Sequence, residues 1–212
     1  MKNYLVEFIG TFFFVLVIVM AASGTAGALA PLAIGTSLMI MVYAGGHISG
    51  GHFNPAVTLA VFLRGKCAGK DVLPYIVSQI LGAAIAALTA NYLLGTVDPN
   101  MVSSNPTPLD IVPSLIAEFL GAFALCYVVL QTATTSSTSG NSYYGLAIGF
   151  TVMAMAYTLG AVSGGAFNPA VAIGITVASM KVWGDIWIFL LANLGAGALA
   201  AFVFSFVYGK KD

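Results

Sequence analysis

The chain has 212 residues, of which 59% are hydrophobic and 7% are charged, and its formal net charge is zero. Water-soluble domains carry about 25% charged residues, so the composition excludes a soluble protein and indicates one that crosses a membrane several times. The zero net charge offers no basic face to a nucleic acid. Cys67, Cys126 and the two histidines make no metal-binding cluster or disulfide framework, so we expect no cofactor and no metal.

Six apolar stretches are long enough to cross about 30 Å of hydrocarbon. They lie near residues 3–23, 29–45, 71–95, 112–133, 143–162 and 183–208. The first could also be interpreted as a cleaved signal peptide, but Glu7 interrupts it and it has a counterpart later in the chain. Two shorter apolar runs, at 54–63 and 168–180, each begin with Asn-Pro-Ala. We therefore predict an all-α membrane protein with six transmembrane helices and two short helices.

The second half of the chain repeats the first. VEFIGTF at 6–12 resembles AEFLGAF at 117–123, ILGAAIAAL at 80–88 resembles NLGAGALAA at 193–201, and SGGHFNPAV at 49–57 differs in one letter from SGGAFNPAV at 163–171. Each copy has three spans, so the second copy must enter the membrane from the opposite face. We predict a single domain, 1–212, made of a first repeat at 1–95 and an inverted second repeat at 112–208.

Charge placement predicts the orientation. Loop 96–111 has no lysine or arginine, whereas basic residues follow the first short helix and the sixth span, namely Arg64, Lys66, Lys70, Lys210 and Lys211. The positive-inside rule then places both termini in the cytoplasm, in the plasma (cell inner) membrane. Lys181 would lie on the outer side and is an exception.

Each Asn-Pro-Ala run is half a span long. Ten residues from Asn54 make about 15 Å of helix. Asparagine is a good N-cap and proline fits the first helical turn, while Gly45, Gly46, Gly50 and Gly51 suit an extended segment before it. The chain therefore re-enters the membrane as a loop and returns as a half-helix, once from each face. Irregular backbone at this depth survives only where protein or water satisfies it, which indicates a water-filled pore.

Two opposed triplets, Asn54-Pro55-Ala56 and Asn168-Pro169-Ala170, would meet near mid-membrane. Their amides would donate into the pore, and loop carbonyls would accept along it: those of Gly50, Gly51, His52, Gly164, Gly165 and Ala166. A cation would meet two positive helix ends and lose its hydration. A small neutral molecule could exchange hydrogen bonds and pass, so we predict a passive channel for water and small uncharged solutes.

The spans, the two triplets, HISGGHFNPAV and the paired EF(I/L)G segments resemble the aquaporin (major intrinsic protein) family over nearly the whole chain. The resemblance implies an aquaporin-like fold and a homotetramer with one pore per subunit. It also implies a constriction at Ile34, Ala156, Gly165 and Val171, where family members usually have arginine at the last position. Such a filter would be wide, apolar and uncharged, and could pass glycerol, urea, ammonia, hydrogen peroxide or metalloid hydroxides.

Two observations leave the solute open. Ala172 stands where glycerol-facilitating members usually carry an aspartate, so that subgroup fits poorly. Neighbouring aromatic residues (Tyr43, Tyr157 or Phe167) could also refill the constriction, which would leave an essentially water-selective pore.

Three polar residues in apolar surroundings need a role. We expect Glu7 and Glu118, at matching places in the repeats, to accept hydrogen bonds from the loop backbone; proton coupling in a secondary transporter is the alternative. We expect His47 to shape the inner mouth, although a pH sensor is also conceivable. A closed structural protein is a further alternative. No catalytic arrangement supports an enzyme.

Overall fold

The computed structural model describes residues 1–102 and 106–209, and this part of the chain is helical throughout its regular segments. Lys210 and Lys211, used above for orientation, lie outside the described residues. The helices are α1 Lys2–Met20, α2 Ala30–Ser49, α3 Pro55–Leu63, α4 Gly69–Val97, α5 Ile111–Ala133, α6 Tyr144–Ser163, α7 Pro169–Val177 and α8 Ile186–Tyr208.

Within the described ranges, six helices are long and apolar enough to cross a membrane: α1, α2, α4, α5, α6 and α8. The first span continues through a π-helical turn, Ala21–Thr25, and the last is preceded by a 3-10 turn, Trp183–Asp185. The predicted six spans with two short helices are confirmed.

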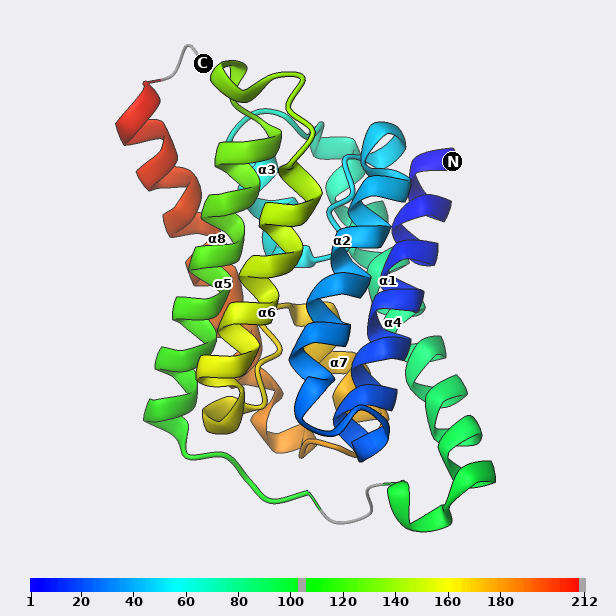
Figure 1. Ribbon diagram of the computed structural model, residues 1–212. Coiled ribbons are helices and arrows are strands. Elements are labelled where there is room, and N and C mark those ends of the chain that lie inside the picture. The colour runs from blue at the N-terminus through cyan, green and yellow to red at the C-terminus, as the bar shows by residue number, and fades with distance from the viewer. Residues whose placement is uncertain (103–105, 210–212) are drawn as a thin grey trace.

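The two halves pack in the same way and exchange their short helices. α1 packs on α4 as α5 packs on α8, while α3 contacts α8 and α7 contacts α4. α1 begins and α8 ends at one end of the bundle, hereafter the termini end. The short helix α3 lies in the half nearer that end and α7 lies in the other half (Figure 1). The half-helices are thus opposed.

Small residues let the backbones approach closely where helices cross. A Cβ built on Gly82 of α4 would lie 2.6 Å from the Phe8 carbonyl oxygen. A Cβ on Gly197 of α8 would lie 2.6 Å from the carbonyl oxygen of Ala56 on α3. In an apolar solvent, close packing of this kind holds helices together. Gly82 thus lets two long helices, α1 and α4, approach, and Gly197 lets the short helix α3 pack against α8.

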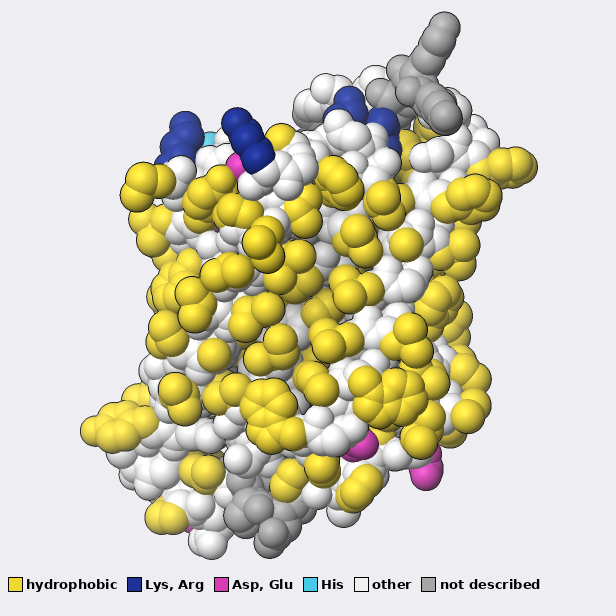
Figure 2. All heavy atoms as spheres, turned by 180° about the vertical axis from the view of Figure 1, so that it is seen from behind, with side chains coloured by type: hydrophobic (Ala, Val, Ile, Leu, Met, Phe, Trp, Pro, Cys, Tyr) yellow, Lys and Arg dark blue, Asp and Glu magenta, His cyan; other side chains and the backbone are white. Residues whose placement is uncertain are grey.

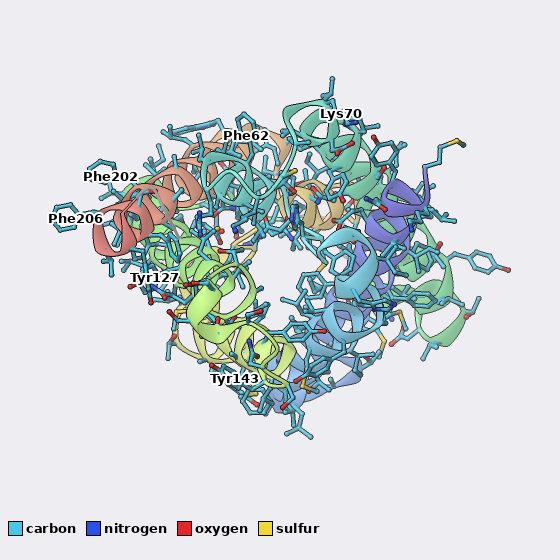
Figure 3. All side chains as sticks on the ribbon, turned by 90° about the horizontal axis from the view of Figure 1, so that it is seen from above. Phe62, Lys70, Tyr127, Tyr143, Phe202 and Phe206 are labelled. Carbon is cyan, nitrogen blue, oxygen red and sulfur yellow. The ribbon has the colours of Figure 1, made fainter. Side chains whose placement is uncertain are left out.

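The outside of the bundle is apolar, as expected of a surface that faces lipid. Phe206 is 83% exposed and Phe202 69% exposed, and both side chains point away from the bundle (Figure 3). Figure 2 shows hydrophobic side chains covering the middle of one face, with lysine and arginine gathered at the termini end. The chain is an integral membrane protein.

Helix α2 is longer than the sequence predicted. Gly45 and Gly46 were expected in an extended segment, but both are helical, and α2 ends at Ser49, where Gly50 takes the left-handed φ of 92°. Gly45 stays in the helix because its bare face packs on α1 and the loop: a Cβ there would lie 2.7 Å from Val6 Cγ1. The second short helix is shorter than predicted, ending at Val177 rather than 180.

Candidate functional site

Both short helices begin at an asparagine cap. Asn54 Oδ1 accepts a hydrogen bond from the Ala56 N–H at 2.8 Å, and Asn168 Oδ1 accepts one from Ala170 at 2.9 Å. Each asparagine has extended backbone angles, and a proline follows at the first helical position. Such caps satisfy helix N–H groups that have no internal partner, so the Asn-Pro-Ala sequence itself starts each half-helix.

The two caps are also bonded to each other's loops. Asn54 Nδ2 donates to the Phe167 carbonyl at 3.0 Å, and Asn168 Nδ2 donates to the Phe53 carbonyl at 2.9 Å. Both asparagines are 2% exposed. An amide group has two N–H bonds, so each asparagine retains a second donor after locking the opposite loop.

Each loop turns at a phenylalanine in the left-handed region, with φ of 48° at Phe53 and 49° at Phe167. A buried carboxylate holds each turn. Glu7 accepts from the Phe53 N–H at 2.7 Å and the His52 N–H at 3.0 Å. Glu118 accepts from the Phe167 N–H at 2.7 Å and from the Ala166 N–H at 2.9 Å. Since the carboxylates take the N–H donors, the loops have their carbonyl oxygens left to offer.

Sequence reasoning missed a polar network around the first loop. Gln79 of α4 donates to Glu7 Oε2 at 2.8 Å and to the Thr58 hydroxyl at 3.0 Å. The Thr58 hydroxyl lies 3.2 Å from His52 Nδ1. The available signal was a glutamine within an apolar span, since a buried polar side chain needs a partner.

A narrow cavity, hereafter the lumen, lies at the two caps. Asn54, Asn168, Gly51 and His52 give it polar groups, and its apolar lining is Phe14, Leu38, Val57, Leu125, Val129, Ile148, Val152 and Ala166. A water molecule in such a cavity can form some of its hydrogen bonds with the polar groups of the protein. Its other hydrogen bonds are made with the next water molecules along the cavity, because the apolar wall offers none.

A wide vestibule of about 890 Å³ opens at the termini end and shares His52 and Val129 with the lumen. Figure 3, viewed from that end, shows the helices in a ring around a central opening. His47 lines this vestibule together with Lys66, Cys67, Asp71 and Tyr75. Residues of the first loop therefore line both cavities.

The four residues of the expected constriction come from four segments. Ile34 is on α2 and Ala156 on α6, both partly exposed, Gly165 is in the second loop, and Val171 on α7 is 1% exposed. None of the four lines the vestibule or the lumen described above.

The aromatic residues that could refill the constriction each have contacts of their own. The Tyr43 hydroxyl donates to the Ser142 carbonyl at 3.0 Å, and the Tyr157 hydroxyl donates to the Ala28 carbonyl. The ring of Phe167 is buried against Gly121. Two of them stay close to the expected constriction: the Phe167 ring lies 3.4 Å from a Cβ built on Gly165, and Tyr157 follows Ala156 in the chain.

An inverted helical bundle with two opposed half-helices capped on a common lumen is the architecture of a membrane channel. The chain belongs to the Major intrinsic protein family, whose sequence model matches residues 1–204. Members of this family are passive channels and not enzymes.

Curated relatives and solved structures agree with this membership. The chain is 34% identical to "Aquaporin NIP1-1" of Zea mays over 173 residues, covering 82% of this chain and 60% of that protein. It is also 34% identical to "Glycerol uptake facilitator protein-like 6" of Lactiplantibacillus plantarum, with full coverage of both chains. The structure of the aquaglyceroporin from Plasmodium falciparum matches the fold with a TM-score of 0.78 at 21% identity, covering 99% of this chain and 95% of that one.

Proposed function

We propose that this chain is a passive channel for water and small uncharged solutes that excludes ions and protons. The observation that carries the proposal is the meeting of two opposed half-helix caps, Asn54 and Asn168, beside a narrow lumen with an apolar wall. Each half-helix directs the positive end of its dipole toward the caps. A dehydrated cation is repelled there, whereas a neutral molecule can accept hydrogen bonds from the remaining amide N–H groups.

The solute range is set, in this proposal, by a wide filter at Ile34, Ala156, Gly165 and Val171. All four residues are uncharged, and the hydroxyl groups of Tyr43 and Tyr157 are bonded to the Ser142 and Ala28 carbonyls. Such a filter admits molecules larger than water, of the class of glycerol, urea, ammonia, hydrogen peroxide or metalloid hydroxides. A relative named as a glycerol uptake facilitator supports this breadth.

Two other functions are outcomes of the test. The narrow lumen at the caps favours an essentially water-selective channel. A secondary transporter would need a carboxylate free to bind a coupling ion, but Glu7 and Glu118 are both fully buried and bonded to the loops. Glu7 and Glu118 therefore serve as structural residues in this proposal.

The proposal includes an assembly and an orientation. Each protomer contains its own lumen, as expected for a homotetramer with one pore per subunit. The basic side chains at the termini end (Figure 2) favour a cytoplasmic position for both termini in the plasma membrane.

Stopped-flow light scattering on proteoliposomes tests the function, with water, glycerol and urea gradients. We expect wild type to pass all three faster than protein-free vesicles. Val171→Arg adds a long charged side chain to the filter and should lower glycerol and urea rates at least about tenfold, equivalent to about 1.4 kcal/mol of barrier. Val171→Met controls for length without charge.

Wild-type vesicles no more permeable than bare lipid would exclude a channel. Water flux without glycerol or urea flux would establish the water-selective alternative. Equal solute rates in wild type and a correctly assembled Val171→Arg protein would show that the constriction lies elsewhere.

A further inference from the structure

The one-letter difference between the two loops creates a space beside the second loop. In the first loop the His52 imidazole lies against Gly50: a Cβ built on that glycine would be 3.1 Å from Nε2 and 3.2 Å from Cδ2. The second loop has Ala166 at the matching place, and its methyl group leaves this space open. Lys181 fills it: a Cβ on Gly164 would be 2.5 Å from Cε and 2.7 Å from Nζ of the lysine.

A closed turn brings Lys181 to this position. After α7, Ser179 takes the left-handed φ of 61°, and the Met180 N–H donates to the Ile175 carbonyl at 2.9 Å. The turn after α3 is its counterpart, since the Lys66 N–H donates to the Val61 carbonyl at 3.0 Å. The residue that follows is Cys67 in the first half and Lys181 in the second.

The first-half counterparts show where Lys181 lies relative to the pore. Cys67 and His52, at the positions matching Lys181 and Ala166, both line the vestibule at the termini end. By the inverted symmetry, Lys181 lies at the opposite mouth, against the backbone of the second loop. At this mouth the ammonium group of Lys181 lies against the loop. At the first mouth the imidazole of His52 occupies the corresponding place.

Two carboxylates lie close enough to the Lys181 ammonium to act on its charge. Burial lowers the pKa of Lys181, and the carboxylates of Glu118 and Asp185 act in the opposite direction and favour its charged form. Asp185 is itself held by the Leu109 N–H at 2.9 Å. The expected filter residues carry no charge, whereas the Lys181 side chain packs directly against the second loop at Gly164.

We propose that Lys181 repels cations at the mouth beside the second loop and donates hydrogen bonds there to entering uncharged polar solutes. The small side chain of Ala166 is required, because a larger one would displace the lysine. This inference rests on the proposed channel function and adds a specificity-determining residue to it.

Cation leak through proteoliposomes tests the role of the charge. We expect Lys181→Met to raise potassium and proton flux roughly tenfold, as for loss of a unit charge about 10 Å from the path at an effective dielectric near 20. Lys181→Arg should keep wild-type flux. Lys70→Met is the matched control, because this lysine is exposed on α4 and should change nothing.

Ala166→His tests the space. The imidazole should displace Lys181, so that at pH 8 the leak rises as in Lys181→Met although the lysine remains, and the double variant should leak no more than either single variant. Water flux is measured in every sample. Absence of water flux in wild type would refute the channel itself, whereas normal water flux with wild-type cation leak in both Lys181→Met and Ala166→His would overturn this inference alone.

Discussion

The two loops share one backbone and differ in the side chains around it. Ser49 donates to Glu7 at 2.6 Å and Ser163 donates to Glu118 at 2.6 Å. The hydrogen bond from the backbone N–H of the left-handed phenylalanine to the carboxylate is 2.7 Å long in both halves. The bonds that hold each loop to its carboxylate are thus the same in both halves, which indicates that this clamp is a condition of the fold.

Beyond the clamp the halves diverge. Gln79, Thr58 and His52 form a side-chain network under the first loop. At the positions 114 residues later, which is the offset between the two loops, the second half has Asn193, Ala172 and Ala166. The Asn193 amide acts on Glu118, but neither of its polar atoms makes a hydrogen bond of full geometry in the described structure. The comparison shows that a duplicated clamp can support two chemically different mouths.

Removing a clamp carboxylate should have the largest effect. Glu7 accepts from Ser49, His52, Phe53 and Gln79, whereas Glu118 accepts from Ser163, Ala166 and Phe167. Each buried donor left without an acceptor costs about 1–3 kcal/mol. Thermal unfolding in detergent should therefore show severe loss for Glu118→Ala and a greater loss for Glu7→Ala. Equal losses would mean that the Gln79 bond contributes nothing.

Adding a methyl group under the left-handed phenylalanines should have the next largest effect. A Cβ on Gly10 or Gly121 would overlap the ring of Phe53 or Phe167, and overpacking costs about 1–3 kcal/mol. Gly10→Ala and Gly121→Ala should lower the melting temperature by similar amounts. Gly160→Ala is the control, because nothing lies within 4 Å of a Cβ there. A stable Gly121→Ala protein would show that the ring can move aside.

The smallest expected effect is the difference in stability loss between variants of the two buried amides, Gln79 and Asn193. Gln79→Leu removes two hydrogen bonds and leaves Glu7 and Thr58 with one partner fewer, so we expect a loss of about 1–3 kcal/mol. Asn193→Leu replaces an amide that acts on Glu118 without a hydrogen bond of full geometry, so we expect a smaller loss than for Gln79→Leu, below about 1 kcal/mol. The two melting temperatures measured side by side check this, and a larger loss for Asn193→Leu would contradict it.

Local signals in the sequence predicted the architecture. Hydrophobic length gave the spans, and Asn-Pro-Ala after paired glycines gave the half-helices with their caps at Asn54 and Asn168. These features depend on residues close in sequence, where propensity and capping act directly. The misplaced end of α2 shows the limit: Gly45 reads as a helix breaker by itself, but its packing against Val6 and Phe53 keeps it helical.

Contacts between distant residues could not be predicted in this way. The amide of Asn54 finds the carbonyl of Phe167 because the two half-helices are apposed by the whole bundle. Lys181 was noted as an exception to the charge rule, but its place beside Gly164 depends on the turn at Ser179 and on the small side chain of Ala166.

The reciprocal amide bonds have a consequence for biosynthesis. The carbonyl of Phe53 in the first loop accepts its hydrogen bond from the amide of Asn168, which lies 115 residues later in the chain. The ribosome therefore adds the donor long after the acceptor. Until translation has passed this point, the first re-entrant segment lacks its counterpart and the nascent chain holds an unfinished hairpin in the membrane. Either half produced as a separate polypeptide would keep its own carboxylate clamp but would lack the amide donor that the other half supplies.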